Sequence, residues 1–336
     1  MPTLSISIPT HDGRAEVLDR LLGEIEGQLV PGVRERVEVC VSDNGSRDAT
    51  GAVLERRGKT LDLVTHRFER NDGFTPNLLA VVQIASGDFC WLLGSDDLIA
   101  PGGVAAVLAL LDAHPQVAGL TLNRYRVNVF DPDTGHHDPA DELPADAGDE
   151  HVYDSALATF ANVGLLHDYI STQVVRRELF EEVVRATTAA ELAAAGHFAH
   201  LLLLGRVVQR RPCWAWAPAA LVQHTTGTSA LDEDLDNDWT SYQLAVMEGR
   251  DAVWSMLFGR RSLTYKAVMA KAHQRTARRG AILMLKSRDK HTLRSDVALL
   301  VAFVRWFFWH PPFWTRTLPV LLIPAIVVKN VSRLRR

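Results

Sequence analysis

The sequence predicts an α/β fold with a mostly parallel sheet and helices on both of its faces, followed by a helical, basic C-terminal region. Three observations predict it: apolar runs alternate with amphipathic helical patterns up to about residue 130, polar turn residues follow several of these runs, and the charge changes sign near residue 260. With 336 residues, 47% of them hydrophobic, the chain can bury a large core in about two domains.

Each element follows from its local pattern. Residues 4–8, Leu-Ser-Ile-Ser-Ile, predict a strand, and residues 14–29 place six aliphatic side chains on one face of a helix. By the same reasoning we expect further strands at 37–41, 61–65, 89–93, 117–122, 125–130, 170–175 and 213–216, and helices at 49–57, 76–85, 101–113, 177–186 and 189–208. Residues 131–150, rich in Asp, Pro and Gly, predict a surface loop.

The net charge of −4 conceals a strong asymmetry. Residues 1–259 hold 19 Lys and Arg against 38 Asp and Glu, a net charge of −19, whereas residues 260–336 hold 17 against 2, a net charge of +15. The basic run at 260–294 has no aromatic residues for base stacking apart from Tyr265, so nucleic acid is not the expected partner. The three cysteines are widely spaced and odd in number, which favours a reducing compartment.

Seven aromatic residues crowd into positions 303–314, beside Lys and Arg. Trp-rich apolar sequence next to cations is typical of segments that lie at a membrane surface, so we expect the C-terminal helices to attach the protein peripherally to the cytoplasmic face of the cell membrane. The apolar runs at 297–309 and 318–328 are each shorter than the roughly 20 residues that span a bilayer. A buried core hairpin, a homodimer interface or a re-entrant hairpin are the alternatives. The N-terminus does not have the pattern of a signal peptide.

Polar clusters follow three neighbouring strands, where parallel strands would bring them to one edge of the sheet. Asp96 and Asp97 come directly after the strand at 89–93. Adjacent carboxylates repel each other unless a cation or hydrogen-bond donors neutralise them, and a divalent cation bridging a diphosphate would do so. A helix N-cap pair is the structural alternative. The turn at 42–46, Ser-Asp-Asn-Gly-Ser, and the first strand-to-helix turn complete an expected nucleotide site.

These segments together resemble a known family. Ser-Ile-Pro-Thr-His at 7–11, Val-Ser-Asp-Asn-Gly-Ser-Arg-Asp-Ala-Thr at 41–50, Asn-Asp-Gly-Phe-Thr-Pro-Asn at 71–77 and Ala-Ser-Gly-Asp-Phe at 85–89, leading into Gly-Ser-Asp-Asp at 94–97, match family 2 glycosyltransferases of GT-A fold in order and spacing over about the first 125 residues. Residues 221–229 resemble the late Tyr-Arg-x-His element of the family without its Tyr-Arg. The abequosyltransferase-like branch is the most similar.

The resemblance implies a set of binding residues. Those that would contact the nucleotide sugar are Pro9, Thr10, His11, Asp43, Asn71, Gly73, Asn77, Ser95 and Asp96. Those that would hold Mg or Mn are Asp97, Asp96 and His224; a structural histidine is the alternative for His224. The family commonly writes Asp-x-Asp-Asp where this chain has Gly94, so the metal would depend mainly on Asp97.

Inverting transfer also needs a base for the acceptor hydroxyl, which in the family is commonly an aspartate before a Leu-rich helix. The corresponding stretch, residues 195–202, has no carboxylate, and His200 stands at the aspartate position. Asp168 and Glu191 are the alternatives.

The expected organisation is one GT-A domain, with a nucleotide-sugar-binding half at 1–125 and an acceptor-binding half at 126–235, followed by a helical basic and aromatic region at 236–336. The expected function is metal-dependent, inverting transfer of a sugar from a nucleoside-diphosphate donor to a polyprenyl-diphosphate-linked saccharide in cell-surface polysaccharide assembly. Two alternatives remain at this point. One is a soluble tailoring glycosyltransferase that acts on a small metabolite, and the other is a catalytically silent nucleotide-sugar-binding or membrane scaffold protein.

Overall fold

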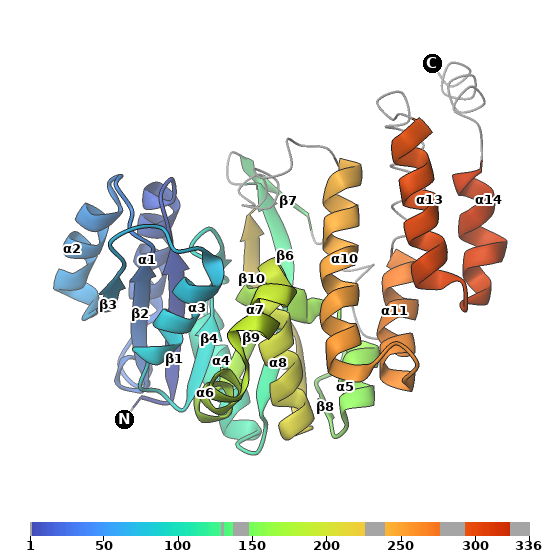
Figure 1. Cartoon of the computed structure of the whole chain (residues 1–336). Coiled ribbons are helices and arrows are strands. Elements are labelled where there is room, and N and C mark those ends of the chain that lie inside the picture. The colour runs from blue at the N-terminus through green and yellow to red at the C-terminus, as the bar shows by residue number, and fades with distance from the viewer. Residues whose placement is uncertain (1, 129–130, 137–147, 226–238, 276–292, 323–336) are drawn as a thin grey trace. The chain divides into compact units, whose positions relative to one another are not determined.

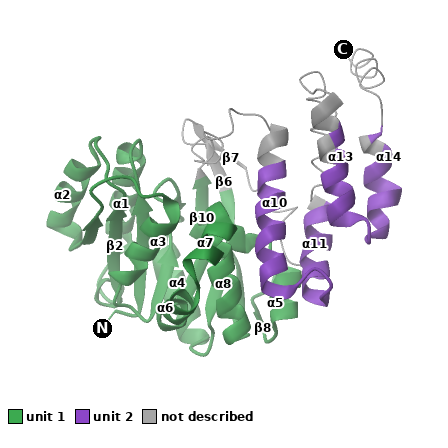
Figure 2. Cartoon of the chain, viewed as in Figure 1, with its two compact units in different colours: residues 1–229 green, residues 230–336 purple. Residues whose placement is uncertain are grey.

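The computed structural model of the chain describes residues 2–128, 131–136, 148–225, 239–275 and 293–322. The chain forms two compact units, Met1–Ser229 and Ala230–Arg336, which Figure 2 colours separately. The expected boundary between residues 125 and 126 falls inside one strand, so the two expected halves share a sheet.

Unit 1 is built on one ten-stranded sheet (Figure 1), in the order β3-β2-β1-β4-β9-β6-β10-β5, with β7 paired to β6 and β8 to β10. The strands are β1 (Leu4–Thr10), β2 (Val37–Asp43), β3 (Val64–Arg67), β4 (Phe89–Leu92), β5 (Leu98–Ile99), β6 (Gly119–Asn128), β7 (Asp131–His136), β8 (His151–Tyr153), β9 (Gln173–Arg176) and β10 (Trp214–Thr225). The pairs among β3, β2, β1 and β4 are parallel, as is β6 with β10. The α/β class is therefore confirmed.

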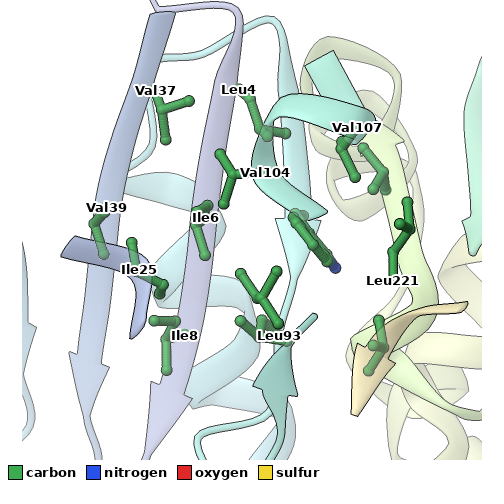
Figure 3. Packing of buried hydrophobic residues seen from close by; sticks show 14 of the residues in the cluster. Leu4, Ile6, Ile8, Ile25, Val37, Val39, Leu93, Val104, Val107 and Leu221 are labelled. Carbon is green, nitrogen blue, oxygen red and sulfur yellow. The ribbon is translucent and has the colours of Figure 1, made fainter. Parts of the chain in front are cut away.

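Helices cover both faces of this sheet. They are α1 (Ala15–Gln28), α2 (Thr50–Leu61), α3 (Phe74–Gln83), α4 (Gly103–Ala113), α5 (Ala156–Asn162), α6 (Arg177–Ala186), α7 (Ala189–Ala195) and α8 (Ala199–Arg210). Strand β1 is buried along its whole length and alternates Leu4, Ile6 and Ile8 on one face with serines on the other. Figure 3 shows α1 and α4 side chains such as Ile25 and Val104 packed against the aliphatic face. Helix α6 contacts both α3 and α8 in the layer drawn in front of the sheet in Figure 1.

The structure corrects several expected elements. The sheet is mixed rather than mostly parallel beyond β4, because β9 enters antiparallel between β4 and β6. Strand β3 begins three residues later than predicted, since α2 continues to Leu61. The two strands expected at 117–122 and 125–130 are one strand, β6, and the first part of the expected loop at 131–150 is strand β7. Residues 129–130 and 137–147 lie outside the described part. The single helix expected at 189–208 is divided at Gly196, whose φ of 54° ends α7.

Unit 2 contains α10 (Trp239–Phe258), α11 (Leu263–Arg275), α13 (Leu293–Phe307), a π-helical turn (Phe313–Thr317) and α14 (Leu318–Leu321). Four of the seven clustered aromatic residues form its core: Phe303, Trp306, Phe307 and Phe313. Phe308 and Trp314 are exposed. The alternative of a buried core hairpin is therefore confirmed for these four residues of the aromatic segment at 303–314. Residues 276–292 and 323–336, which carry much of the basic charge, lie outside the described residues.

Within the described residues, one helical stretch is long and apolar enough to cross a membrane by length and composition, and it is Ala189–Arg210 in unit 1. Its apolar window is 56% buried inside the protein. Leu201, Leu202, Leu203 and Leu204 of α8 have no exposed surface, so the hydrophobicity of this helix is accounted for by core packing.

Candidate functional site

The polar clusters expected from the sequence meet at one edge of the sheet. Strands β1, β2, β4 and β10 all run in the same direction. Strand β1 is parallel to β2 and β4, β9 is antiparallel to both β4 and β6, and β6 is parallel to β10. Thr10 is the last residue of β1, Asp43 the last of β2, and Asp97 follows β4. His224 lies one residue before the end of β10. Open α/β sheets bind ligands beyond the carboxyl ends of their strands, and these four residues stand there.

Thr10, Asp43 and Asn77 form the first part of the site, and all three are buried. The Asn77 side-chain amide donates to the backbone oxygen of Thr10 at 2.9 Å, which joins α3 to the end of β1. One Asp43 oxygen accepts the Ser46 N–H at 3.0 Å, and the other lies 3.4 Å from Nε of Arg67. Thr10 Oγ1, Asp43 Oδ2 and Asn77 Oδ1 have no hydrogen-bond partner within the described residues. Buried polar atoms without partners are costly, so a cluster of three is suited to a polar ligand.

Asn44 was not among the predicted site residues, although it stands beside Asp43 in the predicted turn. Its side-chain NH₂ donates to Asn71 Oδ1 at 2.8 Å and to the Gly73 carbonyl at 3.1 Å, and its oxygen accepts the Asp72 N–H at 3.0 Å. Three hydrogen bonds from one side chain therefore hold the loop that contains Asn71 and Gly73 beside the end of β2. The Asx-type turn signal at 42–46 could have pointed to Asn44, but its partners are 27 to 29 residues away.

Gly45 makes this close approach possible. Its φ is +71°, and a Cβ on Gly45 would lie 2.5 Å from the carbonyl carbon of Arg70. No side chain fits between the two loops at this point, so the turn after β2 and the loop after β3 are in direct backbone contact.

The adjacent carboxylates Asp96 and Asp97 have different partners. Oδ2 of Asp96 lies 3.6 Å from the guanidinium of Arg14, a buried residue that immediately precedes α1. Asp97 is buried and accepts hydrogen bonds at Oδ2 from the hydroxyls of Tyr169, at 2.5 Å, and Ser171. Its Oδ1 lies 3.5 Å from Nδ1 of His224. Neither carboxylate serves as a helix cap at α4, whose N-cap residue is Gly102.

The protonation of Asp97 follows from these neighbours. Burial by itself raises the pKa of the Asp97 carboxyl, but His224, Ser171 and Tyr169 together outweigh burial and hold that pKa below its usual value. Burial and the negative charge of Asp97 raise the pKa of the Tyr169 phenol well above 10. Asp97 is thus ionised and Tyr169 is a neutral donor. The site keeps a buried negative charge of the kind that binds a cation.

The side chains at this position could hold a divalent cation that has few protein ligands. Asp97 supplies a carboxylate and His224 an imidazole, which are ligands that Mn²⁺ accepts, whereas Mg²⁺ prefers the oxygen atoms. No group of three or more His, Cys, Asp or Glu side chains suited to a metal occurs among the residues that the structure describes. The remaining coordination positions would therefore fall to diphosphate and water oxygens.

The structure also explains Gly94, where the family commonly has a carboxylate. The Gly94 N–H donates to Ser171 Oγ at 3.0 Å, and a Cβ on Gly94 would lie 3.0 Å from Asp96 Oδ1 and 3.1 Å from Ser171 Oγ. Ser171 thus fills the space in which a side chain at position 94 would lie. Tyr169 and Ser171, on the segment between α5 and β9, were missed because no sequence pattern places them beside residue 97.

His200 and Asp168 lie together. Nε2 of His200 is 2.8 Å from the backbone oxygen of Asp168, so Nε2 carries the proton and Nδ1 the lone pair. That Nδ1 has no hydrogen-bond partner in the described part of the chain. Burial lowers the pKa of His200 and favours the neutral imidazole. The ring packs edge-on against Phe74, whose centroid is 5.7 Å away and which follows Gly73 directly. This contact connects His200 to the loop of Asn71 and Gly73.

Glu191 is used elsewhere. It forms a capping box with Thr188 at the start of α7 and an ion pair with Arg206 of α8. Arg206 and the Thr188 hydrogen bonds lower the pKa of Glu191 to about 2. No contact of Glu191 with another predicted site residue is present in the described structure, so its observed role is to stabilise a helix end.

The other predicted residues lie close to the strand ends. Pro9 is the penultimate residue of β1, His11 follows its last residue, and Ser95 is buried between Gly94 and Asp96. Trp214 and Trp216, which alternate along β10, are fully buried and therefore belong to the core; the Trp214 indole donates to Thr121 Oγ1.

The described sheet, its strand order and the polar edge define an α/β protein with a ligand site at the carboxyl ends of its strands, a fold similar to that of GT-A glycosyltransferases. A family model, glycosyl transferase family 2, matches residues 5–184. The chain belongs to glycosyl transferase family 2, a family of transferase enzymes.

Known proteins agree with this membership. The chain is 29% identical over 191 residues to abequosyltransferase RfbV of Salmonella typhimurium, and it spans 54% of that relative. The structure of Staphylococcus aureus TarS 1-349 in complex with UDP has a TM-score of 0.60 at 17% identity. The match covers 93% of this chain and 81% of the TarS chain. The structure of mannosyltransferase PcManGT of Pyrobaculum calidifontis in complex with GDP-Man and Mn²⁺ has a TM-score of 0.55 at 16% identity. The match covers 98% of this chain and 87% of the PcManGT chain.

Proposed function

We propose that this protein is a metal-dependent, inverting glycosyltransferase that moves a sugar from a nucleotide-sugar donor to a lipid-linked saccharide in cell-surface polysaccharide assembly. The observation that carries the proposal is the buried cluster at the strand ends. There, oxygen atoms of Thr10, Asp43 and Asn77 that have no hydrogen-bond partner among the described residues stand on the same sheet edge as the ionised Asp97. The abequosyltransferase relative supports the assignment to envelope polysaccharide synthesis.

The nucleoside part of the donor is expected to contact Pro9, Thr10, His11, Asp43 and Asn77, with the loop of Asn71 and Gly73 closing over it. Asn44 keeps that loop in place. The TarS structure is a complex with UDP and the PcManGT structure a complex with GDP-Man, which supports a nucleoside diphosphate at this edge. Ser95 and Asp96 follow β4, where the ribose and diphosphate would reach.

The cation, Mg or Mn, would be held by Asp97 and His224, and it would neutralise charge that develops on the leaving diphosphate. Asp96 is the third predicted ligand, and its pairing with Arg14 favours an indirect role through water or ribose. The Mn²⁺ in the PcManGT complex supports this assignment.

The acceptor hydroxyl must lose its proton as its oxygen bonds to the anomeric carbon and the bond to the diphosphate breaks. His200 is the proposed base because its Nδ1 lone pair has no partner within the described residues and its imidazole is held neutral. Asp168, whose side chain is half-buried and whose backbone oxygen lies 2.8 Å from Nε2 of His200, is the alternative. Glu191 is a weaker candidate since it is engaged at the start of α7.

The proposed acceptor is a saccharide carried on polyprenyl diphosphate at the cytoplasmic face of the membrane, with the protein attached peripherally through its C-terminal helices. The charge of +15 over residues 260–336 supports contact with anionic lipid and with the acceptor diphosphate.

The function is tested by incubating the purified protein with UDP-, dTDP-, CDP- and GDP-sugars in the presence of Mg²⁺ or Mn²⁺ and measuring binding and slow hydrolysis. We expect one donor class to bind, and Asp97→Asn to lower its turnover at least about 100-fold. Asp112→Asn, at an exposed ion pair with Arg36, is the matched control and should retain activity. A folded protein that binds none of these donors would refute the proposal.

The base is tested by the pH dependence of turnover in His200→Gln, Asp168→Asn and Glu191→Gln. If His200 is the base, only His200→Gln removes the acidic limb of the profile, whereas Glu191→Gln should change stability and leave the profile intact. A profile that loses its acidic limb in Asp168→Asn alone would transfer the role to Asp168.

A further inference from the structure

Helix α13 of unit 2 has two apolar faces. Phe303, Trp306 and Phe307 are buried on one of them, with exposed fractions of 3% or less. Val297 and Val301 lie on the opposite side, as does Phe308, which directly follows α13 and continues its hydrogen bonding through its N–H to the Val304 oxygen; the three are 51%, 61% and 60% exposed. With 3.6 residues per turn, positions 297, 301, 305 and 308 fall within about one quarter of the helix circumference. A helix on the surface of a globular protein normally has polar residues opposite its core face, so this face calls for another explanation.

Trp314 extends the exposed apolar face. It is 47% exposed, and its indole N–H donates to the backbone oxygen of Phe308 at 2.7 Å, which fixes the Trp314 ring beside the C-terminal end of α13. Arg305 and Arg316 are also exposed and flank the pair in sequence. We call Val297, Val301, Arg305, Phe308 and Trp314 the outer face. It combines aliphatic groups, an amphipathic indole and a cation, which is the composition of segments that lie at headgroup depth.

The positive charge of residues 260–336 indicates which partner binds the outer face. Residues 260–336 hold 17 Lys and Arg against 2 Asp and Glu. A symmetric dimer through this face would bring two such cationic regions together, because the same patch meets itself across a two-fold axis. An anionic bilayer instead gains from both the charge and the apolar groups.

We propose that the outer face is the surface that inserts into the headgroup region of an anionic bilayer, with Phe308 and Trp314 as its deepest side chains and Phe303, Trp306 and Phe307 serving only as core. The inference rests on the proposed membrane location and specifies which residues produce it. Arg305 and Arg316 contact lipid phosphates.

The test is flotation of the full chain with vesicles of phosphatidylcholine alone or with phosphatidylglycerol. We expect binding to the anionic vesicles, and at least a tenfold lower partition coefficient for the combined Val301→Ser, Phe308→Ser and Trp314→Ser variant. The matched control is Val64→Ser with Leu157→Ser, which removes exposed apolar groups of unit 1, and it should float like the wild type. Arg305→Glu with Arg316→Glu should also weaken binding, whereas Arg20→Glu with Arg56→Glu, on exposed helices of unit 1, should not.

Hydrogen–deuterium exchange of the unmodified protein gives an independent result. Peptides covering 297–314 should become protected when anionic vesicles are added. Unchanged exchange there, or equal flotation of wild type and outer-face variant, would overturn the proposal. If light scattering shows a dimer in the wild type and a monomer in the outer-face variant, the face belongs to a second copy of the chain. If the protein retains a protein partner but does not bind lipid, the face belongs to that partner. Nucleotide affinity is measured separately. An unmodified protein that binds the donor but does not bind anionic vesicles would refute this inference and not the enzymatic function.

Discussion

The Tyr169 hydroxyl donates a 2.5 Å hydrogen bond to Oδ2 of Asp97, from a segment 72 residues further along the chain. Tyr169 also contacts His224 through the same hydroxyl, and the Arg124 guanidinium lies 3.9 Å from the centroid of its ring. One phenol thus connects the carboxylate after β4 with the histidine near the end of β10. The acidic centre of the site depends on a residue for which the sequence offers no motif.

Tyr169→Phe should destabilise the protein and raise the pKa of Asp97. The variant removes one of the hydrogen bonds to a buried carboxylate, and bonds to charged groups contribute about 1.5–3 kcal/mol. Urea denaturation at pH 7 measures the loss in the free energy of unfolding. Tyr125→Phe, a change of the same kind on β6, is the control. An equal effect of both variants would contradict the role of Tyr169 at Asp97.

Gly94→Asp should weaken metal binding, although it restores the carboxylate common in the family. The new side chain would begin 3.1 Å from Ser171 Oγ and 3.0 Å from Asp96 Oδ1, so it would displace Ser171, which donates to Oδ2 of Asp97. We expect this misplacement of Asp97 to outweigh the attraction of an added carboxylate for the cation. Mn²⁺ titration followed by electron paramagnetic resonance, together with the melting temperature, tests this expectation. Gly58→Asp, at a helix position with nothing within 4 Å of the added Cβ, controls for the residue change. Tighter Mn²⁺ binding by Gly94→Asp would show that the site can rearrange.

Asn44→Ala should reduce nucleotide affinity more than stability. The change removes three hydrogen bonds to the loop at 71–73, and the free loop then has to be ordered when nucleotide binds. We expect about tenfold weaker binding of the preferred nucleoside diphosphate in calorimetric titrations, which corresponds to about 1.4 kcal/mol. Asn162→Ala, which removes a side-chain hydrogen bond within α5, should leave the affinity unchanged. Unaltered affinity in Asn44→Ala would mean that the loop is held by other contacts.

Stability should fall as the pH is lowered because of His167. This side chain is fully buried, and neither ring nitrogen has a hydrogen-bond partner in the described part of the chain. Burial, with a smaller contribution from the neighbouring His200 imidazole, lowers the pKa of His167 to about 3. The folded-state pKa lies below the unfolded value of about 6.5, so the unfolded chain binds more protons between these two pH values. The stabilisation is complete above about pH 6.5 and is lost toward pH 3, with a slope that approaches 1.4 kcal/mol per pH unit.

His167→Leu should remove this contribution to the slope of the unfolding free energy against pH. Denaturant unfolding at several pH values measures the slope, and the exposed His151→Leu is the control. The slope is the informative quantity, since the Leu variant also changes core packing. Equal slopes in wild type and His167→Leu would show that the buried imidazole is protonated in the folded protein.

Much of the fold was predictable because its signals are local. The alternating Leu4, Ile6 and Ile8 of β1 and the single apolar face of α1 are short-range patterns, and the polar residues at the strand ends follow from them. The errors occur where tertiary contacts override local preference. Strand β9 pairs antiparallel with strands from two distant segments, and β10 continues to Thr225, well past the apolar run that predicted it.

By itself, the sequence determined the α/β class, the family, the strand-end motifs and the separation of acidic from basic sequence, because each of these is written in residue type and spacing. Only the tertiary structure decided which carboxylate has which partner: Asp96 faces Arg14, Asp97 accepts from Tyr169 and Ser171, and Glu191 caps α7. It also separated the buried aromatic residues of α13 from Phe308 on the outer face. Hydrogen bonds and burial depend on segments that are distant in the chain and near in space, and spacing along a sequence does not specify such contacts.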